Sequence, residues 1–208
     1  MDPLIRLFRE KPEALELLGR VWEILYVEGS TPDIGKRREG FIRMLLEKEF
    51  GLEVAPAPSM EREWDFRVTI EGEERTYSLK TTETITTVKV AWNGFPSIER
   101  ARKFEFKYPI IYVTGDRRQK VIAIYIFDLE DLKSLKEEMG DDMWWIPRRG
   151  TNPRGFGINK RAIERLMEKA RTKGNYVSKE YHHIDVNAIR KEYWEGWYNL
   201  LKKLAFKE

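Results

Sequence analysis

The chain contains no cysteine and only two histidines in its 208 residues. Without cysteine, disulfides and thiolate metal sites are excluded, which favours a cytoplasmic protein. His182 and His183 are adjacent and have no third ligand spaced nearby, so they do not predict a zinc site. The sequence also has no apolar run long enough to span a membrane and no signal-like start. We therefore expect a cytoplasmic protein with no membrane partner.

A strong excess of one charge is also missing. Lys and Arg number 38 against 35 Asp and Glu, a formal net charge of +3. Any basic surface must therefore come from segregation of charges on the folded molecule. The length suits a single domain, residues 1–208, with a full core. We divide it into a helical cap (1–34), a core (35–140) and a C-terminal region of loop and helices (141–208).

The most informative pattern is a predicted β-hairpin over residues 64–80. Apolar residues alternate with polar ones in both halves: Trp64, Phe66, Val68 and Ile70, then Tyr77 and Leu79. A turn at Gly72-Glu73 would make Asp65 face Lys80, with Ser78 one step along the same polar face. This arrangement is a candidate metal-and-water site. The alternative is a surface cross-strand ion pair, which stabilises a protein little.

Asp65, a hairpin and then Leu79-Lys80 resemble the PD-(D/E)XK nuclease superfamily. The resemblance implies that the aspartate and the acidic residue two before the lysine bind Mg²⁺, while the lysine assists the attacking water. The chain departs from the motif in lacking the proline before Asp65 and in having Ser78 where Asp or Glu is expected. Serine is a weak, neutral ligand, so a second carboxylate must come from elsewhere or the metal binds weakly.

Glu39 is a candidate for that carboxylate. A helix is predicted from about residue 36 to 50, ended by Gly51. Residues 38–54 resemble the first core helix of the same superfamily, in which an early glutamate often reaches the metal site. Glu39 matches that position, although a glutamate near a helix N-terminus is also favoured by the helix dipole alone. Glu83 is a second reserve carboxylate.

The remaining elements predict an α/β fold with a mixed β-sheet flanked by helices and with extra N- and C-terminal helices. Helices are expected over 3–28 (divided at Pro12), 97–104, 129–139, 159–173 and 186–205, and strands over 81–92, 109–114 and 120–127. A turn is expected at Gly115-Asp116. The last helix is expected to dock on the body of the domain, with a dimer contact as the alternative. This order agrees with a restriction-endonuclease-like core.

Residues 144–160 form a Gly/Pro-rich loop flanked by aromatic residues, which we interpret as the main DNA-reading loop. Its polar members are Arg148, Arg149, Asn152 and Arg154. Arginine and asparagine are the side chains that read guanine and adenine edges through paired hydrogen bonds. The alternative is a solvated basic loop. Further DNA contacts are expected from Lys89 and Asn93, and from Lys160 at the start of a basic helix.

Together these features resemble type II restriction enzymes, which implies a Mg²⁺-dependent endonuclease acting as a homodimer on double-stranded DNA. Asp65, Glu39 and the Leu79 carbonyl would hold Mg²⁺, and Lys80 would position or deprotonate the attacking water. Two alternatives stay open. One is a structure-specific or repair nuclease or junction resolvase. The other is a non-catalytic DNA-binding module, in which Ser78 marks decay of the site.

Overall fold

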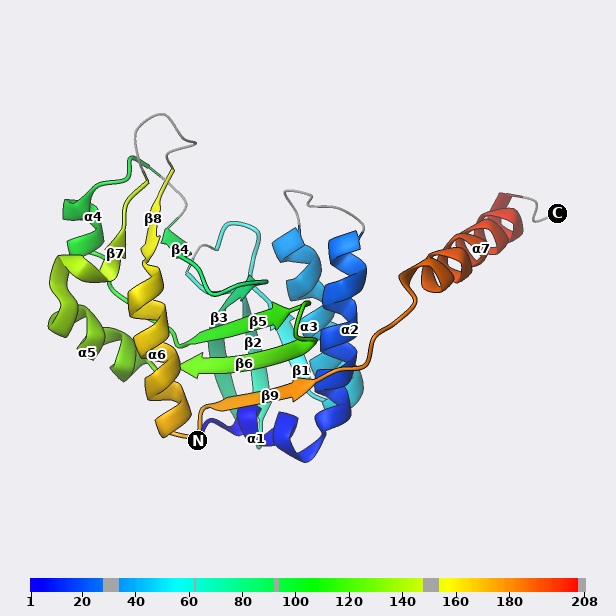
Figure 1. Ribbon diagram of the computed structural model, residues 1–208, viewed down its shortest axis with the longest axis horizontal. Coiled ribbons are helices and arrows are strands. Elements are labelled where there is room, and N and C mark those ends of the chain that lie inside the picture. Colours follow the sequence, from blue (N-terminus) through cyan, green and yellow to red (C-terminus); the bar gives the residue numbers. More distant parts are fainter. Residues whose placement is uncertain (28–33, 62, 92–93, 148–153, 206–208) are drawn as a thin grey trace.

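The computed structural model describes residues 1–27, 34–61, 63–91, 94–147 and 154–205. A six-stranded sheet lies at the centre, with helices on both of its faces and a three-stranded sheet beside it (Figure 1). The main sheet is mixed, because β3 and β5 are parallel while its other neighbouring strands are antiparallel. This arrangement confirms the predicted α/β class.

The main sheet has the order β1-β2-β3-β5-β6-β9 and the smaller sheet the order β4-β8-β7. The elements along the chain are α1 (Pro3–Glu10), α2 (Pro12–Val27), α3 (Ile34–Phe50), β1 (Glu53–Pro56), β2 (Phe66–Ile70), β3 (Glu73–Thr82), β4 (Val88–Ala91), α4 (Ile98–Arg102), β5 (Ile110–Asp116), β6 (Val121–Phe127), α5 (Leu129–Met139), the 3-10 helix η1 (Gly140–Met143), β7 (Trp144–Trp145), β8 (Phe156–Ile158), α6 (Lys160–Thr172), β9 (Tyr176–Glu180) and α7 (Val186–Ala205).

The main sheet is buried on both faces at its centre. Ile111 and Val113 of β5 pack into one apolar cluster with α1, α2 and α3. Ile110 and Tyr112, which alternate with them, belong to a second cluster with α5, α6 and the smaller sheet. Burial on both faces explains why β5 and β6 are nearly continuous apolar runs in the sequence.

The predicted turn at Gly115-Asp116 is wrong, because both residues belong to β5 and the chain turns after them. Gly115 pairs with Ile122 of β6. A Cβ atom at Gly115 would lie 2.1 Å from Cδ1 of Trp22, whose fully buried indole packs against the strand at this point. Glycine is therefore required here by the close approach of α2 to the sheet.

The predicted register of the hairpin is wrong by two residues. The turn is Glu71-Gly72, with φ angles of +55° and +81°, the left-handed pair that a tight hairpin turn needs. Phe66 consequently pairs with Tyr77 rather than with Leu79. A shift of two residues keeps every side chain on its predicted face, because side chains alternate along a strand.

Helix α7 does not dock on the body of the domain as expected. None of its described side chains is buried, and the helix projects away from the body of the domain (Figure 1). Its amphipathic pattern predicted an apolar face correctly, but within the described residues that face has no element of the same chain to cover it. No helix in the described ranges is long and apolar enough to cross a membrane.

Candidate active site

Asp65 stands where the pairing between β2 and β3 ends. Its backbone N–H donates to the carbonyl of Tyr77 at 2.9 Å, the last such bond toward this end of the hairpin. Past this bond β3 is no longer paired with β2, and the Asp65 side chain takes over as acceptor. Its Oδ2 accepts the backbone N–H of Leu79 at 2.5 Å. The end of the ladder therefore fixes the position of the carboxylate.

Ser78 and Lys80 project from the same face of β3 toward this carboxylate. The Ser78 hydroxyl donates to Asp65 Oδ2 at 3.1 Å, and Lys80 Nζ lies 3.4 Å from the same oxygen. Lys80 Nζ also donates to Ser78 Oγ and to the Leu79 carbonyl, each at 3.0 Å. Ser78 is thus a bridge that donates to the acid and accepts from the amine. The structure brings the predicted trio together, although Ser78 rather than Lys80 stands opposite Asp65.

Glu39 approaches the same place from α3. Burial, followed by the negative charge of Asp65, raises the pKa of the Glu39 carboxyl group. Arg43, which forms an ion pair with Glu39 at 3.5 Å, and the charge of Lys80 act in the opposite direction. Glu39 therefore shares the electrostatic field of the Asp65–Lys80 pair, as expected of a second carboxylate at this site.

Glu83, the reserve carboxylate, is already engaged by two arginines. The almost fully buried Arg38 contacts it at 2.8 Å, and Arg117 lies 3.9 Å from its other oxygen. Arg38 also lies over the indole of Trp22, at 4.6 Å from the ring centroid. Glu83 thus neutralises a buried guanidinium, and Glu39 is the better placed of the two acids.

The oxygen donors at this site suit a hard cation better than a soft one. Two carboxylates in one field, Asp65 and Glu39, and the nearby carbonyl of Leu79 are the ligand types that Mg²⁺ takes. In the described part of the chain, however, no three His, Cys, Asp or Glu side chains are grouped closely enough to hold a metal ion. A Mg²⁺ ion here would therefore have few protein ligands, and water would have to complete its shell.

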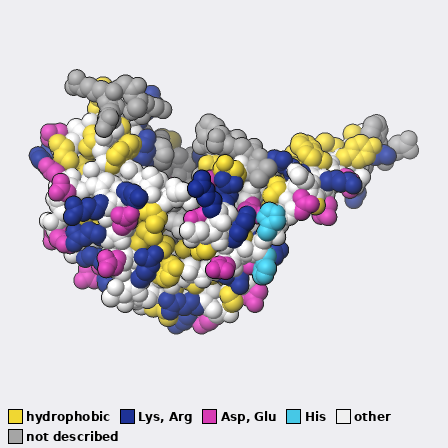
Figure 2. All heavy atoms as spheres, viewed as in Figure 1, with side chains coloured by type: hydrophobic (Ala, Val, Ile, Leu, Met, Phe, Trp, Pro, Cys, Tyr) yellow, Lys and Arg dark blue, Asp and Glu magenta, His cyan; other side chains and the backbone are white. Residues whose placement is uncertain are grey.

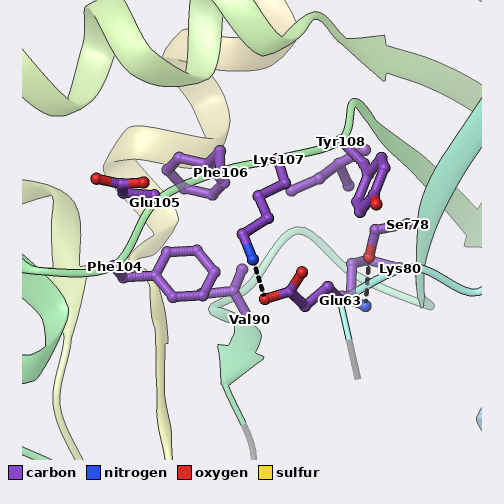
Figure 3. A pocket seen from close by; sticks show the side chains of 10 residues that line it. Glu63, Ser78, Lys80, Val90, Phe104, Glu105, Phe106, Lys107 and Tyr108 are labelled. Atoms are coloured by element: carbon purple, nitrogen blue, oxygen red, sulfur yellow. Dashed lines mark hydrogen bonds and ion pairs between the residues drawn. The ribbon is translucent and has the colours of Figure 1, made fainter. Parts of the chain in front are cut away.

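A pocket opens beside Ser78 and Lys80, and sequence reasoning missed most of its walls (Figure 3). Its empty volume is about 420 Å³, and its lining is Glu63, Ser78, Lys80, Val90, Phe104, Glu105, Phe106, Lys107, Tyr108 and Ile110. Glu63 and Lys107 form an ion pair at 2.8 Å on its exposed side. Residues 104–108 alternate aromatic and charged side chains just before a buried strand, and this alternation is the sequence signal that could have identified them as pocket residues.

The two segments considered for DNA contact meet in the smaller sheet. Strand β4, which carries Lys89, pairs with β8, which follows the loop, and β8 pairs with β7, which precedes it. Lys89 lies 5.8 Å from the ring centroid of Trp145. Arg154 is exposed at the edge of the loop. The predicted contacts Arg148, Arg149, Asn152 and Asn93 lie outside the described residues.

Lys160 is the remaining predicted DNA contact. It begins α6, is largely exposed and pairs with Glu164 at 3.7 Å. Its neighbours in a surface groove include Glu83 and Thr84, which follow the end of β3.

Comparison with known proteins identifies the fold. No family model matches the chain, and no curated protein matches it. Among solved structures, a restriction endonuclease in complex with substrate DNA superposes with a TM-score of 0.66 and 23% sequence identity, covering 94% of this chain and 100% of that one. The chain has a restriction-endonuclease-like fold. This fold places the Asp65–Ser78–Lys80 cluster at the end of a hairpin in a mixed sheet, and Glu39 on a helix that covers one face of that sheet.

Proposed function

We propose that this protein is a Mg²⁺-dependent endonuclease that cuts double-stranded DNA at a specific sequence, in the manner of type II restriction enzymes. The observation that carries the proposal is the convergence of Asp65, Ser78 and Lys80 within 3.4 Å of one another, in the field of Glu39. The likeness to a restriction endonuclease solved with DNA supports it through the fold. Two such active sites in a homodimer would cut the two strands of a symmetric site.

Asp65, Glu39 and the Leu79 carbonyl are the groups that would hold Mg²⁺. When bound, the ion would polarise the scissile phosphate and acidify a water molecule. Three hydrogen bonds from described residues reach Asp65 on Oδ2, so Oδ1 is the oxygen of this carboxylate left for a cation. The Leu79 carbonyl accepts from Lys80, so Lys80 and a cation would share this acceptor.

Lys80 supplies the positive charge of the site. Its ammonium group is held by Ser78 Oγ and the Leu79 carbonyl at 3.0 Å, on the side that faces the pocket (Figure 3). A cation fixed beside the scissile phosphate stabilises the negative charge that develops there during attack by water. Lys80 would also orient that water as a hydrogen-bond donor. Ser78 fixes both partners, which accounts for a serine where the superfamily has an acid.

The loop at 148–154 and the β4 segment are proposed to recognise bases. Their flanking strands β4, β7 and β8 form one sheet, so contacts from both segments would reach the same stretch of DNA. Lys160 lies in a surface groove with Glu83 and Thr84 and is proposed to bind only phosphate. Phosphate contacts fix the position of a protein on DNA, whereas base contacts carry its specificity.

The proposal is tested by incubating the protein with supercoiled plasmid and with genomic DNA, with Mg²⁺ or with EDTA. We expect discrete fragments only with Mg²⁺, and no cleavage by Asp65→Asn or Lys80→Ala. Arg6→Ala, which removes an exposed ion pair with Glu71, is the control and should cut at the wild-type rate. Both site variants should still bind DNA in a gel-shift assay.

The outcomes separate the proposal from its alternatives. Cleavage restricted to branched or damaged DNA would indicate a structure-specific nuclease or junction resolvase. DNA binding without cleavage under any Mg²⁺ concentration would indicate a non-catalytic binding module. Cleavage by Asp65→Asn at the wild-type rate would remove Asp65 from the mechanism.

A further inference from the structure

Helix α7 carries the largest group of exposed apolar side chains in the described chain. Seven of the exposed large hydrophobic residues are on it, each 48% to 66% exposed: Tyr193, Trp194, Trp197, Tyr198, Leu200, Leu201 and Leu204. Hydrophobic side chains gather along this projecting arm (Figure 2). A contiguous apolar surface of this kind on a soluble protein marks an interaction site.

The apolar residues of α7 form two parallel stripes. Tyr193, Trp197, Leu200 and Leu204 are spaced by four, three and four residues, the repeat of a helix that pairs with another helix. Trp194, Tyr198 and Leu201 repeat the same spacing one position along. One helix cannot cover both stripes, so α7 requires two neighbouring elements.

A groove on the body lies where α7 begins. It runs between α2 and α3, and its lining is mostly apolar apart from Arg37 and Arg190. Ile189 and Tyr193 are the apolar residues of α7 that reach it. Only the first turns of α7 reach this groove. The remaining apolar surface of both the groove and the arm is left without a cover from described residues.

We infer that α7 is the arm through which two copies of this chain associate, as an antiparallel helix pair. In an antiparallel pair the first stripe places Tyr193 against the partner's Leu204 and Trp197 against the partner's Leu200. Because Tyr193 lines the groove, the last turn of the partner's helix, which carries Leu201 and Leu204, arrives at the groove. A parallel pair would carry both helix ends away from both grooves.

The size of the surface fits a stable dimer. A full aromatic side chain offers about 150–250 Å². With about half of each of the seven side chains exposed, one arm offers on the order of 700 Å² of apolar surface. The first stripe and Leu201 make up about five-sevenths of this surface, so two arms bury roughly 1,000 Å², the area that a specific interface should reach. This inference deepens the proposed homodimer but does not depend on cleavage, because its test measures mass and cross-linking.

The first test is the mass of the full chain in solution by sedimentation equilibrium. We expect twice the chain mass of 24.8 kDa for the wild type, and the monomer mass for Trp197→Glu/Leu200→Glu. Met60→Glu/Phe95→Glu places the same two charges on residues that are 80% and 86% exposed elsewhere, and should remain dimeric. A monomeric wild type at the highest soluble concentration, or a dimeric arm variant, would overturn the inference.

The second test does not require α7 to tolerate a charge. The chain has no cysteine, so introduced thiols report on one contact alone. Under mild oxidation Tyr193→Cys/Leu204→Cys should form a covalent dimer, and a mixture of the two single variants should do the same. Each single variant alone should not, because its two copies lie about 16 Å apart in an antiparallel pair. Self-linking of Tyr193→Cys alone would mean parallel arms, and no linking of the double variant would exclude the pair.

Discussion

Ser78→Ala tests whether the serine positions the site or binds the metal. The change removes the bond to Asp65 at 3.1 Å and the bond from Lys80 at 3.0 Å. A hydrogen bond to a charged group contributes about 1.5–3 kcal/mol, but Asp65 keeps the Leu79 N–H and Lys80 keeps the Leu79 carbonyl. The net loss of positioning should therefore be about 1–3 kcal/mol, a decrease of about 5- to 150-fold in cleavage rate.

The Mg²⁺ concentration for half-maximal activity should stay within about twofold, since in this arrangement Ser78 is not a ligand. The assay is the initial rate of plasmid linearisation over a Mg²⁺ series, with thermal melting as the check on folding. Ser178→Ala is the matched control, because Ser178 also uses its hydroxyl on a strand, accepting from Tyr176 at 2.6 Å on the opposite half of the sheet. A larger shift in the Mg²⁺ requirement for Ser78→Ala than for Glu39→Gln would refute the bridging role and make the serine a ligand.

Three further predictions concern Glu39, Gly115 and the loop at 148–154. Glu39 has a raised pKa, so its ionised form costs folding free energy at neutral pH, and Glu39→Gln should raise Tm at pH 7 while it raises the Mg²⁺ requirement. The gain in Tm should shrink as the pH falls through the raised pKa and should be gone below about the ordinary value of 4.5. Gly115→Ala should destabilise the fold by about 1–3 kcal/mol in denaturant titration because its Cβ meets Trp22, whereas Gly40→Ala, which meets nothing, should be neutral or stabilising. Arg148→Ala, Arg149→Ala or Arg154→Ala should each cost roughly 1–3 kcal/mol of DNA-binding free energy and relax specificity at one base pair. Lys160→Ala should weaken binding to all DNA sites alike and flatten the salt dependence of binding. If the arginine variants instead lose affinity equally for all sites, the loop binds phosphates and not bases.

The sequence predicted the composition of the site better than its register. Alternation along a strand is local, so it placed Asp65, Ser78 and Lys80 on one face whatever the even shift of the hairpin. The turn was misplaced because Glu71, a residue that rarely adopts positive φ, has φ +55° beside Gly72. The long side chain of Lys80 still reaches Asp65, so the predicted contact between these two residues is present although the predicted strand register is wrong.

Features that depend on distant parts of the chain could not be predicted. Gly115 reads as a turn residue, and only the indole of Trp22, which is 93 positions away in the chain (115 − 22), explains it as a strand residue. The pocket beside Lys80 needs residues 104–108, which no local pattern connects to the hairpin. The apolar stripes of α7 can be recognised in the sequence, but an apolar stripe does not predict which surface packs against it.

The hydrogen bond from the Leu79 N–H to the Asp65 carboxylate has a consequence for how this protein could change during evolution. Because the acid completes the strand pairing, its loss would leave a partly buried N–H without an acceptor and would weaken the sheet. A descendant that had lost catalysis would therefore be under pressure to retain an acceptor at position 65. Lys80, whose bonds do not belong to the strand ladder, would be free to drift. Among natural variants, retention of the lysine would thus be the better indicator that the proposed activity is still under selection.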